Sequence, residues 1–205
     1  MIYKTLTVAR EYGSGGAEIA RRTAERLGWR LVDNELIARI SAMAEVPVGH
    51  TVALDERVDP WLHRMTRRLW GAGGDGVSLV EPVDVLDAER VATISKQLIE
   101  EAYAAGDCVI VGRGAQCVLH GAPGVFHVFV YGSWKDRVNR VRARLAEGEH
   151  VEDAILKADR QRRDYVQRYY GRDRMDPHLY DLMIDPHGRP EATAALIELA
   201  MRSAG

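Results

Sequence analysis

A glycine-rich turn near the amino terminus, Gly13-Ser14-Gly15-Gly16, separates a predicted strand from a predicted helix. Residues 4–9 are rich in Thr and Val, which favours a strand. After the turn, apolar residues recur at helical spacing as far as Gly28, a residue suited to ending a helix. A strand, a tight turn and a helix in this order form the first unit of an α/β fold.

The same alternation continues along the rest of the chain. Short apolar runs predict four further strands, at residues 29–32, 108–111, 125–131 and 182–184. Amphipathic segments predict helices near residues 34–44, 55–70, 87–105, 133–145, 151–170 and 190–201. A continuous apolar strand such as Cys108–Val111 is typical of a parallel sheet that is covered on both faces. We therefore expect one α/β domain over residues 1–205, with a five-stranded parallel sheet.

Charge is distributed unevenly along the sequence. The 28 basic and 30 acidic residues give a net charge of −2, and all but four of the basic residues are Arg. Between residues 137 and 174, ten Arg and Lys157 outnumber seven acids, so this segment carries +4 and the remainder −6. Local positive charge in an acidic chain suits a small anionic ligand better than nucleic acid. The Arg excess is explained either by codon bias or by bidentate binding of phosphate.

Composition excludes several other classes of protein. A chain that is 46% hydrophobic and 28% charged is too apolar to be disordered. No run approaches the roughly 18 apolar residues of a membrane span, and the first ten residues do not resemble a signal peptide. We therefore expect a cytoplasmic protein with no membrane partner. Cys108 and Cys117 lack metal-binding spacing and are expected to be core thiols.

The glycine-rich turn is a candidate anion cradle. Backbone N–H groups and the positive end of the helix dipole meet there, glycines permit close approach, and Ser14 can donate a hydroxyl. The phosphate-loop pattern Gly-x-x-x-x-Gly-Lys-Ser/Thr is not met. If Gly15 is matched to the second glycine, Arg10 replaces the first and Gly16 replaces the lysine. Glu18 then replaces the hydroxyl residue, when one extra glycine is allowed.

Five motifs resemble those of the cytidylate kinase-like family, in the family's order and over nearly the whole chain. They are Ala9–Gly16, Val32–Ile37, Val111–Ala115, Asp159–Arg162 with Tyr165 and Tyr169–Gly171, and Tyr180–Ile184. The resemblance implies a P-loop NTPase-like three-layer fold. It also implies a helical monophosphate-binding insertion at about 45–105 and a short lid at about 150–175.

The function implied by this resemblance is transfer of a phosphoryl group from ATP, with Mg²⁺, to a nucleoside monophosphate. CMP and dCMP are the first candidate acceptors, and UMP is the next. The residues implied to bind the ATP phosphates are Gly13, Ser14, Gly15, Gly16 and Ala17. The residues implied for the monophosphate are Asp33, Arg39, Arg113, Asp159, Arg162 and Arg163. Arg10, Arg113 and Arg162 are the predicted catalytic residues, because phosphoryl transfer needs positive groups around the moving charge.

Two departures from the family pattern stand out. The phosphate-loop lysine is missing at Gly16, and the acid expected at a strand end to help hold Mg²⁺ is Val111. Arg10, which leaves the first strand beside the loop, is the predicted substitute for the lysine. Glu18, in the first turn of the helix, is the predicted contact of Mg²⁺.

Several alternatives remain open from the sequence. Arg39 could pair with Glu35, and Arg162 with Arg163 could lie on a solvated helix face. Arg113 follows a buried strand directly, where ligands of open α/β sheets bind, and so favours a functional role. The missing lysine and acid leave open a nucleotide-binding sensor, and the same fold could phosphorylate another small molecule. Residues 61–76 could form a flap or the surface of a homodimer.

Overall fold

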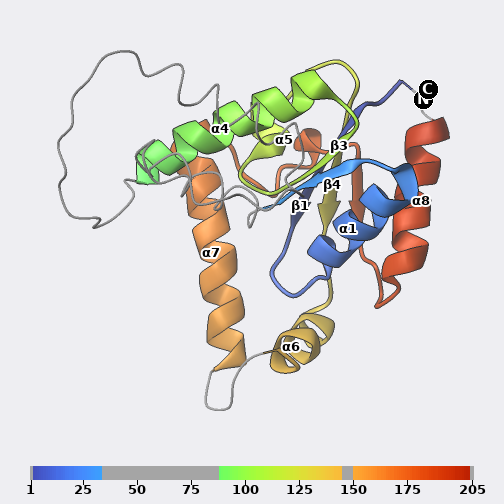
Figure 1. Cartoon of the computed structure of the whole chain (residues 1–205). Coiled ribbons are helices and arrows are strands. Elements are labelled where there is room, and N and C mark those ends of the chain that lie inside the picture. Colours follow the sequence, from blue (N-terminus) through green and yellow to red (C-terminus); the bar gives the residue numbers. More distant parts are fainter. Residues whose placement is uncertain (1, 34–87, 145–149, 204–205) are drawn as a thin grey trace, which may run out of the picture.

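A computed structural model describes residues 2–33, 88–144 and 150–203, and a five-stranded parallel sheet forms its centre (Figure 1). The strands lie in the order β2-β3-β1-β4-β5, and every neighbouring pair is parallel. Their bounds are β1 Thr5–Arg10, β2 Arg30–Val32, β3 Cys108–Val111, β4 Val125–Val130 and β5 Leu182–Ile184. The predicted α/β class and the five parallel strands are confirmed, and β1 lies in the middle of the sheet.

Helices cover both faces of the sheet, which makes three layers (Figure 1). On one face, α1 (Gly16–Leu27) and α8 (Pro190–Ser203) pack over a core that includes Leu6, Val8 and Ile19. On the other face, α4 (Ala88–Ala105) and the short α5 (Ala115–Val118) cover a second core. Burial on both sides explains why β3 and β4 are continuous apolar runs.

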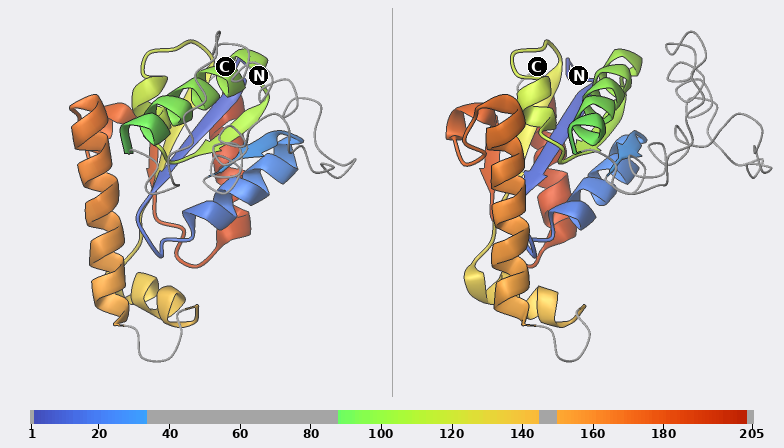
Figure 2. Two further views of the ribbon diagram at one scale, coloured as in Figure 1. Left: turned by 60° about the vertical axis from the view of Figure 1, so that its left-hand side comes forward. Right: turned by 90° about the vertical axis from the view of Figure 1, so that its left-hand side faces the viewer.

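A pair of helices extends beyond the sheet. α6 (Trp134–Arg142) begins at Ser133, whose hydroxyl accepts a hydrogen bond from the N–H of Asp136, as expected of an N-cap. The long helix α7 (Val151–Tyr170) packs against α6 around a small apolar cluster, and Figures 1 and 2 show α6 at one end of α7. Tyr12 packs on that cluster, so the glycine-rich turn contacts this helix pair.

Most predicted elements within the described part of the chain lie close to their expected bounds. The strand predicted at 4–9 is Thr5–Arg10, the helix predicted to residue 145 ends at Arg142, and the helix predicted to residue 201 ends at Ser203. The strand predicted from residue 29 begins at Arg30, and the one predicted to residue 131 ends at Val130. α5 and the 3₁₀ turn Pro177–Leu179 were not expected, because elements this short carry no periodic signal. The predicted helices near 34–44 and 55–70 and the segment 61–76 lie outside the described residues. Of the insertion predicted at about 45–105, residues 88–105 are described, and they form α4, which packs on the sheet. No helix in the described ranges is long and apolar enough to cross a membrane.

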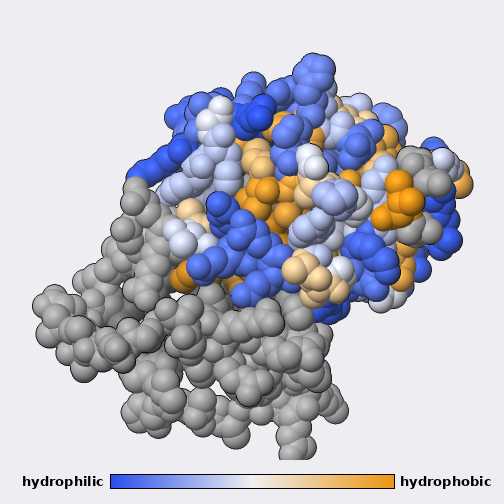
Figure 3. All heavy atoms as spheres, turned by 90° about the horizontal axis from the view of Figure 1, so that it is seen from above, coloured by the Kyte–Doolittle hydropathy of each residue, from blue (hydrophilic) through white to orange (hydrophobic). Residues whose placement is uncertain are grey.

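The edge of the sheet where its parallel strands begin differs in chemistry from the edge where they finish. At the amino-terminal edge, a shallow hollow of about 530 Å³ is lined by Ile2, Lys4, Tyr103, Ala104, Ala105, Gly106, Pro123 and Gly124. Among the residues that the structure describes, Lys4 is the one charged residue in that lining. Seen from above, the surface is largely hydrophilic around a smaller apolar area (Figure 3). The carboxyl-terminal edge, where the glycine-rich turn lies, gathers most of the guanidinium groups described below.

Candidate functional site

The glycine-rich turn is packed tightly against α6. Gly13 and Gly15 adopt left-handed conformations, with φ of 82° and 88°. A Cβ at Gly13 would lie 2.8 Å from Cγ2 of Val141, and a Cβ at Gly15 would lie 2.7 Å from Nη1 of Arg140. Any other residue would therefore strain the backbone at both positions; at Gly13 it would also collide with the backbone of α6, and at Gly15 it would displace the guanidinium of Arg140. The glycines shape a close-packed loop at the start of α1.

Ser14 stabilises the loop from within. It is 3% exposed, its hydroxyl donates to the carbonyl of Glu11 at 3.0 Å, and its Oγ accepts from the N–H of Gly16 at 3.4 Å. The hydroxyl proton is thus engaged inside the loop. The first N–H groups of α1, such as that of Ala17, have no intrahelical partners and are therefore the groups available to an anion.

Arg10 ends β1 and turns toward a cavity. Its stem passes Gly16, where a Cβ would lie 2.6 Å from Cβ of Arg10, and its guanidinium lies against Gly112. Burial, and then the positive charges of Arg162, Arg174 and Arg113, lower the pKa of Arg10 to about 9, while Asp33 opposes the shift. The group is protonated at neutral pH, although its surroundings disfavour that charge.

Four guanidinium groups share this cavity, which has a volume of about 340 Å³. The lining residues are Ala9, Arg10, Tyr12, Gly112, Arg113, Gly114, Gln116, Ala158, Gln161, Arg162, Tyr165, Val166 and Arg174. No carboxylate is present in that lining, as far as the described residues go. The volume falls in the range of small-ligand sites, roughly 300–1,000 Å³. A cavity with four cations and no acid at the carboxyl ends of β1 and β3 is suited to a multiply charged anion.

Arg113 is held in an unusual backbone conformation. It has φ 54°, between Gly112 at 78° and Gly114 at 72°, and Tyr170 donates its hydroxyl to the Arg113 carbonyl at 3.2 Å. Its Nε is buried and has no hydrogen-bond partner among the described residues. Left-handed backbone at a non-glycine residue costs energy and is concentrated at functional sites. The unpaired donor and the strain both agree with a ligand-binding role for Arg113.

Arg162 and Arg174 approach the same point from separate segments. Arg162, on α7, donates Nη1–H to the Arg10 carbonyl at 3.1 Å, and Arg174 donates Nη2–H to it at 2.8 Å. Arg162 also lies over the ring of Tyr12, 5.4 Å from its centroid. Burial, followed by the charge of Arg174, lowers the pKa of Arg162. Three guanidinium groups therefore converge on the end of β1, and Arg113 reaches the same cavity from β3.

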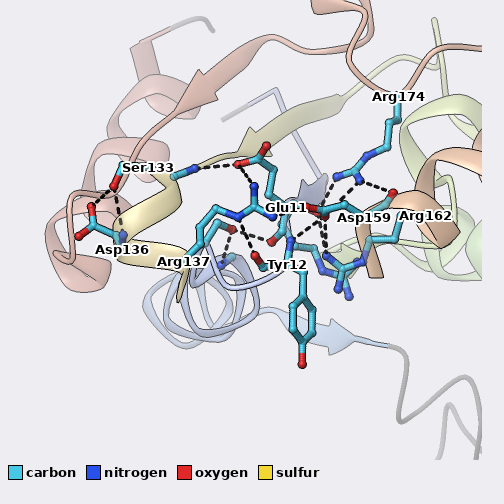
Figure 4. Close-up of polar contacts among 12 residues, drawn as sticks. Glu11, Tyr12, Ser133, Asp136, Arg137, Asp159, Arg162 and Arg174 are labelled. Atoms are coloured by element: carbon cyan, nitrogen blue, oxygen red, sulfur yellow. Dashed lines mark hydrogen bonds and ion pairs between the residues drawn. The ribbon is translucent and has the colours of Figure 1, made fainter. Parts of the chain in front are cut away.

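Asp159 and Arg163 do not line this cavity, although the sequence predicted both for the monophosphate. Asp159 accepts from the N–H of Tyr12 at 2.9 Å, pairs with Arg137, and lies 3.5 Å from Nη1 of Arg174 (Figure 4). Arg163 is exposed beside Asp164, and with Asp159 it lines a second hollow of about 230 Å³. The structure therefore brings Arg10, Arg113 and Arg162 together in one lining that does not include Asp159 or Arg163. Asp159 nevertheless lies 3.9 Å from Nη1 of Arg162, so it borders the group of arginines from outside the cavity. Arg39 lies outside the described residues.

Sequence reasoning missed two buried arginines, Arg137 and Arg174. Arg137 is 7% exposed, donates Nε–H to the Tyr12 carbonyl at 2.8 Å, and lies between the carboxylates of Glu11 and Asp159 (Figure 4). Glu11 also accepts from the N–H of Gly132 at 3.0 Å. The only sequence signal for either arginine was the net positive charge of residues 137–174. That signal could not say which guanidinium groups are buried.

The sequence matches the cytidylate kinase-like family over residues 5–187. The chain belongs to the cytidylate kinase-like family. The matched span contains the glycine loop and all four arginines of the cavity. Membership of this kinase-like family supports phosphoryl transfer as the general reaction. No curated protein of matching sequence was found.

Solved structures agree with the fold of this family member. An uncharacterized protein from Eubacterium ventriosum matches with a TM-score of 0.69 and 20% identity, covering 97% of this chain and 98% of that one. A shikimate kinase from Bacteroides thetaiotaomicron matches with a TM-score of 0.55 and 12% identity, covering 98% and 99%. A shikimate kinase from Acinetobacter baumannii, solved with shikimate, matches with a TM-score of 0.52 and 14% identity, covering 98% and 94%. At these identities the likeness establishes the P-loop kinase-like fold.

The family implies ATP and usually Mg²⁺, and the described residues fit the two unequally. The glycine loop and the first N–H groups of α1 suit phosphates. For the metal, no group of three or more His, Cys, Asp or Glu that could hold an ion occurs in the described ranges. Glu18 accepts hydrogen bonds from Nε and Nη2 of Arg22 at 3.1 and 2.9 Å, and β3 ends at the apolar Val111. Because Glu18 is engaged by arginines, the described residues offer Mg²⁺ no ready-made set of ligands, and an ion bound with ATP would depend mainly on phosphate oxygens and water.

Proposed function

We propose that this protein transfers the γ-phosphoryl group of ATP to a nucleoside monophosphate, with CMP or dCMP as the preferred acceptor and UMP as the next. The observation that carries the proposal is the cavity lined by Arg10, Arg113, Arg162 and Arg174, in whose lining the described residues place no carboxylate. The family supports the reaction class, and the glycine loop supports a phosphate donor.

In this proposal the acceptor phosphate binds in the cavity. Arg113 and Arg10 hold its oxygens, and Arg162 reaches the region between acceptor and donor from α7. The phosphates of ATP lie on the first N–H groups of α1, and Mg²⁺, when bound with them, neutralises part of their charge, with Glu18 as the nearby carboxylate. The protein has little covalent chemistry to perform, because its cations position the two substrates and offset the charge on the transferring phosphoryl oxygens.

The domain organisation is part of the same proposal. One catalytic domain spans residues 1–205, with an acceptor-side insertion within about 45–105 and a lid at about 150–175. The lid would include α7, which carries Arg162. Its closure over the cavity would exclude water and limit wasteful hydrolysis of ATP.

The test is ADP formation by purified protein with MgATP and each of CMP, dCMP, UMP and AMP. Shikimate is included as a fifth acceptor, because two solved structures of similar fold are shikimate kinases. We expect turnover with CMP or dCMP above the rate without acceptor. If shikimate were the only acceptor to give turnover, the proposed acceptor would change from a nucleotide to another small molecule. If none of the five acceptors gave turnover, the kinase proposal would be contradicted.

A nucleotide-binding sensor is the second candidate function. The observations that favour it are Gly16 in place of the phosphate-loop lysine and Val111 in place of the strand-end acid. Calorimetry with ATP and CMP separately distinguishes the candidates. Separate binding of both ligands supports a kinase, and binding of ATP alone supports a sensor.

Arg113→Ala tests the acceptor side directly. Removing the guanidinium should abolish CMP binding while ATP binding persists, because Arg113 lines the cavity rather than the glycine loop. Arg202→Ala is the control, since that side chain is exposed on α8 and pairs with Glu198. Equal loss of ATP and CMP binding in the Arg113 variant would show that its role is not specific to the acceptor.

A further inference from the structure

We propose that Arg140, on α6, supplies the positive charge that a phosphate-loop lysine provides elsewhere, and that it contacts the β- and γ-phosphates of ATP. This rests on the proposed function, because it takes the glycine loop to be the donor site. It differs from the sequence-based prediction, which gave the role of substitute to Arg10. Three observations carry the inference: the space at position 16, the position of Arg140, and the way α6 is anchored.

A lysine cannot take its usual place in this loop. Gly16 is buried at the first position of α1, and a Cβ there would lie 2.6 Å from Cβ of Arg10, 3.1 Å from its Cγ and 3.3 Å from Cβ of Val130. Contacts of this length do not occur between well-packed carbon atoms. The stem of Arg10 fills the space, and its guanidinium continues to Gly112, in the acceptor cavity. Arg10 therefore blocks position 16 while its own charge serves the other substrate.

Arg140 brings a guanidinium group to the loop from the opposite side. Its Nη1, Cζ and Nη2 would lie 2.7, 3.0 and 3.4 Å from a Cβ built on Gly15, so the planar group lies over that residue. Gly15 is the N-cap of α1, immediately before the N–H groups proposed to bind phosphate. A guanidinium presents a fork of donors that matches phosphate oxygens. The group is thus in the position from which it can reach a phosphate on the loop.

The donors of Arg140 are largely unused. Among the described residues, its recorded charge partner is Glu18, whose Oε2 lies 3.7 Å from Nη1, beyond hydrogen-bond distance. Glu18 itself is hydrogen-bonded to Arg22. The side chain of Arg140 is also 21% exposed, so a ligand can reach it from solvent. Glu18 orients the guanidinium without consuming its hydrogen-bonding capacity.

The helix that carries Arg140 is fixed to the loop independently of it. One turn earlier on α6, Arg137 is bound to Glu11, Asp159 and the Tyr12 carbonyl (Figure 4). Val141 packs beside Gly13. Removing the Arg140 side chain should therefore leave both the fold and the loop in place.

The experiment measures dissociation constants for ATP, ADP, AMP and CMP by calorimetry, with Mg²⁺ present. The proteins are the wild type, Arg140→Ala, Arg140→Lys and Arg142→Ala. Arg142 lies on the same helix but is exposed and faces Glu152 at 3.9 Å, which makes it a matched control. A thermal unfolding scan of each variant establishes that it is folded.

We expect Arg140→Ala to weaken ATP and ADP binding by about 10- to 100-fold, the range for loss of a hydrogen bond to a charged group. AMP and CMP binding should change little, and Arg140→Lys should recover part of the loss. If Arg140→Ala bound ATP as tightly as the wild type does, the assignment of Arg140 to the β- and γ-phosphates would be overturned. An equal loss of affinity for ATP and AMP would overturn it as well. If the wild type binds no ATP or ADP, the proposed function fails and the role of Arg140 with it. If the wild type binds ATP but Arg140→Ala does not weaken that binding, the assignment of Arg140 fails and the proposed function stands.

Discussion

Arg137 and Arg10 lie beside the same glycine loop in opposite surroundings. Arg137 is placed between two carboxylates, Glu11 and Asp159, and a backbone carbonyl accepts its Nε–H. Arg10 has three arginines as its strongest charged neighbours, and Asp33 opposes them with a weaker influence. Among the described residues, Arg137 is paired with carboxylates, whereas the charges around Arg10 are mainly positive.

Under the proposed function, the difference separates a structural arginine from a binding arginine. A buried charge is tolerated when partners compensate for its lost hydration, and the Arg137 cluster supplies them. Those contacts join the loop to α6 and α7. The group around Arg10 has donors and positive charge in excess, which an anion would compensate. Under the proposed function, Arg137 holds the loop and the arginines of the cavity receive a ligand, and Asp159 links the two sets through its ion pairs with Arg137, Arg162 and Arg174.

The largest expected effect comes from breaking the neutralised cluster. Arg137→Ala leaves the carboxylates of Glu11 and Asp159 partly buried without their main partner. Loss of one member of a buried ion pair costs about 3–5 kcal/mol, and we expect a fall of this size in the free energy of unfolding, measured in urea.

The matched control for that experiment is Arg142→Ala on the same helix. Arg142 is exposed and its partner Glu152 is 3.9 Å away, so the change should stay within about 0.5 kcal/mol. A loss in Arg137→Ala no larger than in the control would show that the buried cluster is not structural.

Arg10→Met should have the opposite signature. Methionine keeps an apolar stem beside Gly16 but removes a charge that burial and neighbouring cations disfavour. The free energy of unfolding should stay level or rise, while CMP affinity falls by about 30-fold or more, the lower limit for truncating one partner of a buried charge pair. Urea unfolding and calorimetry give the two values. A destabilised variant with unchanged CMP affinity would make Arg10 equivalent to Arg137 and remove the contrast.

The fold was largely predictable because its signals are local and repeated. Cys108–Val111 is apolar throughout, since both faces of β3 are covered, and Val151–Tyr170 has a helical pattern bounded by Gly171. Such patterns depend on residues near one another in sequence. α5 escaped prediction because four residues are too few to show a period.

The candidate site was predictable only in part, because burial and pairing depend on distant segments. Arg113 could be found, since it follows a buried strand at the edge where ligands bind. Arg162 and Arg163 are adjacent in sequence, yet one lines the cavity and the other the second hollow. Asp159 meets Arg137 across 22 positions and Arg174 across 15. No local pattern could have assigned the roles of these side chains.

Gly112→Ala tests whether the position of Arg10 matters as well as its charge. A Cβ at Gly112 would lie 1.9 Å from Nη1 of Arg10, so the guanidinium must move. Because the long side chain can shift, we expect a loss of CMP affinity of about tenfold, or about 1.4 kcal/mol. Calorimetry provides the measurement.

Gly28→Ala is the control for the backbone cost of that substitution. Gly28 has φ 66°, close to the 78° of Gly112, but a Cβ there meets nothing within 4 Å. Both variants should lose about 1–2 kcal/mol of unfolding free energy for left-handed backbone, and only Gly112→Ala should lose CMP affinity. If both variants bound CMP equally well, the position of Arg10 would be irrelevant to the acceptor.

The smallest expected effect is a pH dependence that an ordinary arginine would not give. Because the pKa of Arg10 is lowered to about 9, its charge is lost at a pH where other arginines keep theirs. CMP affinity should therefore fall by about fourfold between about pH 7.5 and 9.5, as the fraction of protonated Arg10 falls. Burial raises the pKa of Tyr165, which also lines the cavity, so Tyr165 stays neutral in this range.

Stability without ligand should change in the opposite direction over the same range. Above about pH 9 the unfolded chain keeps a proton on Arg10 that the folded protein has lost, so the free energy of unfolding rises with pH. Arg10→Met should remove both this rise and the loss of CMP affinity, whereas Arg142→Ala should keep them. The wild type and Arg10→Met could instead show the same dependence of CMP affinity and unfolding free energy on pH. In that case the neighbouring cations would not lower the pKa of Arg10, and the contrast with Arg137 would rest on contacts alone.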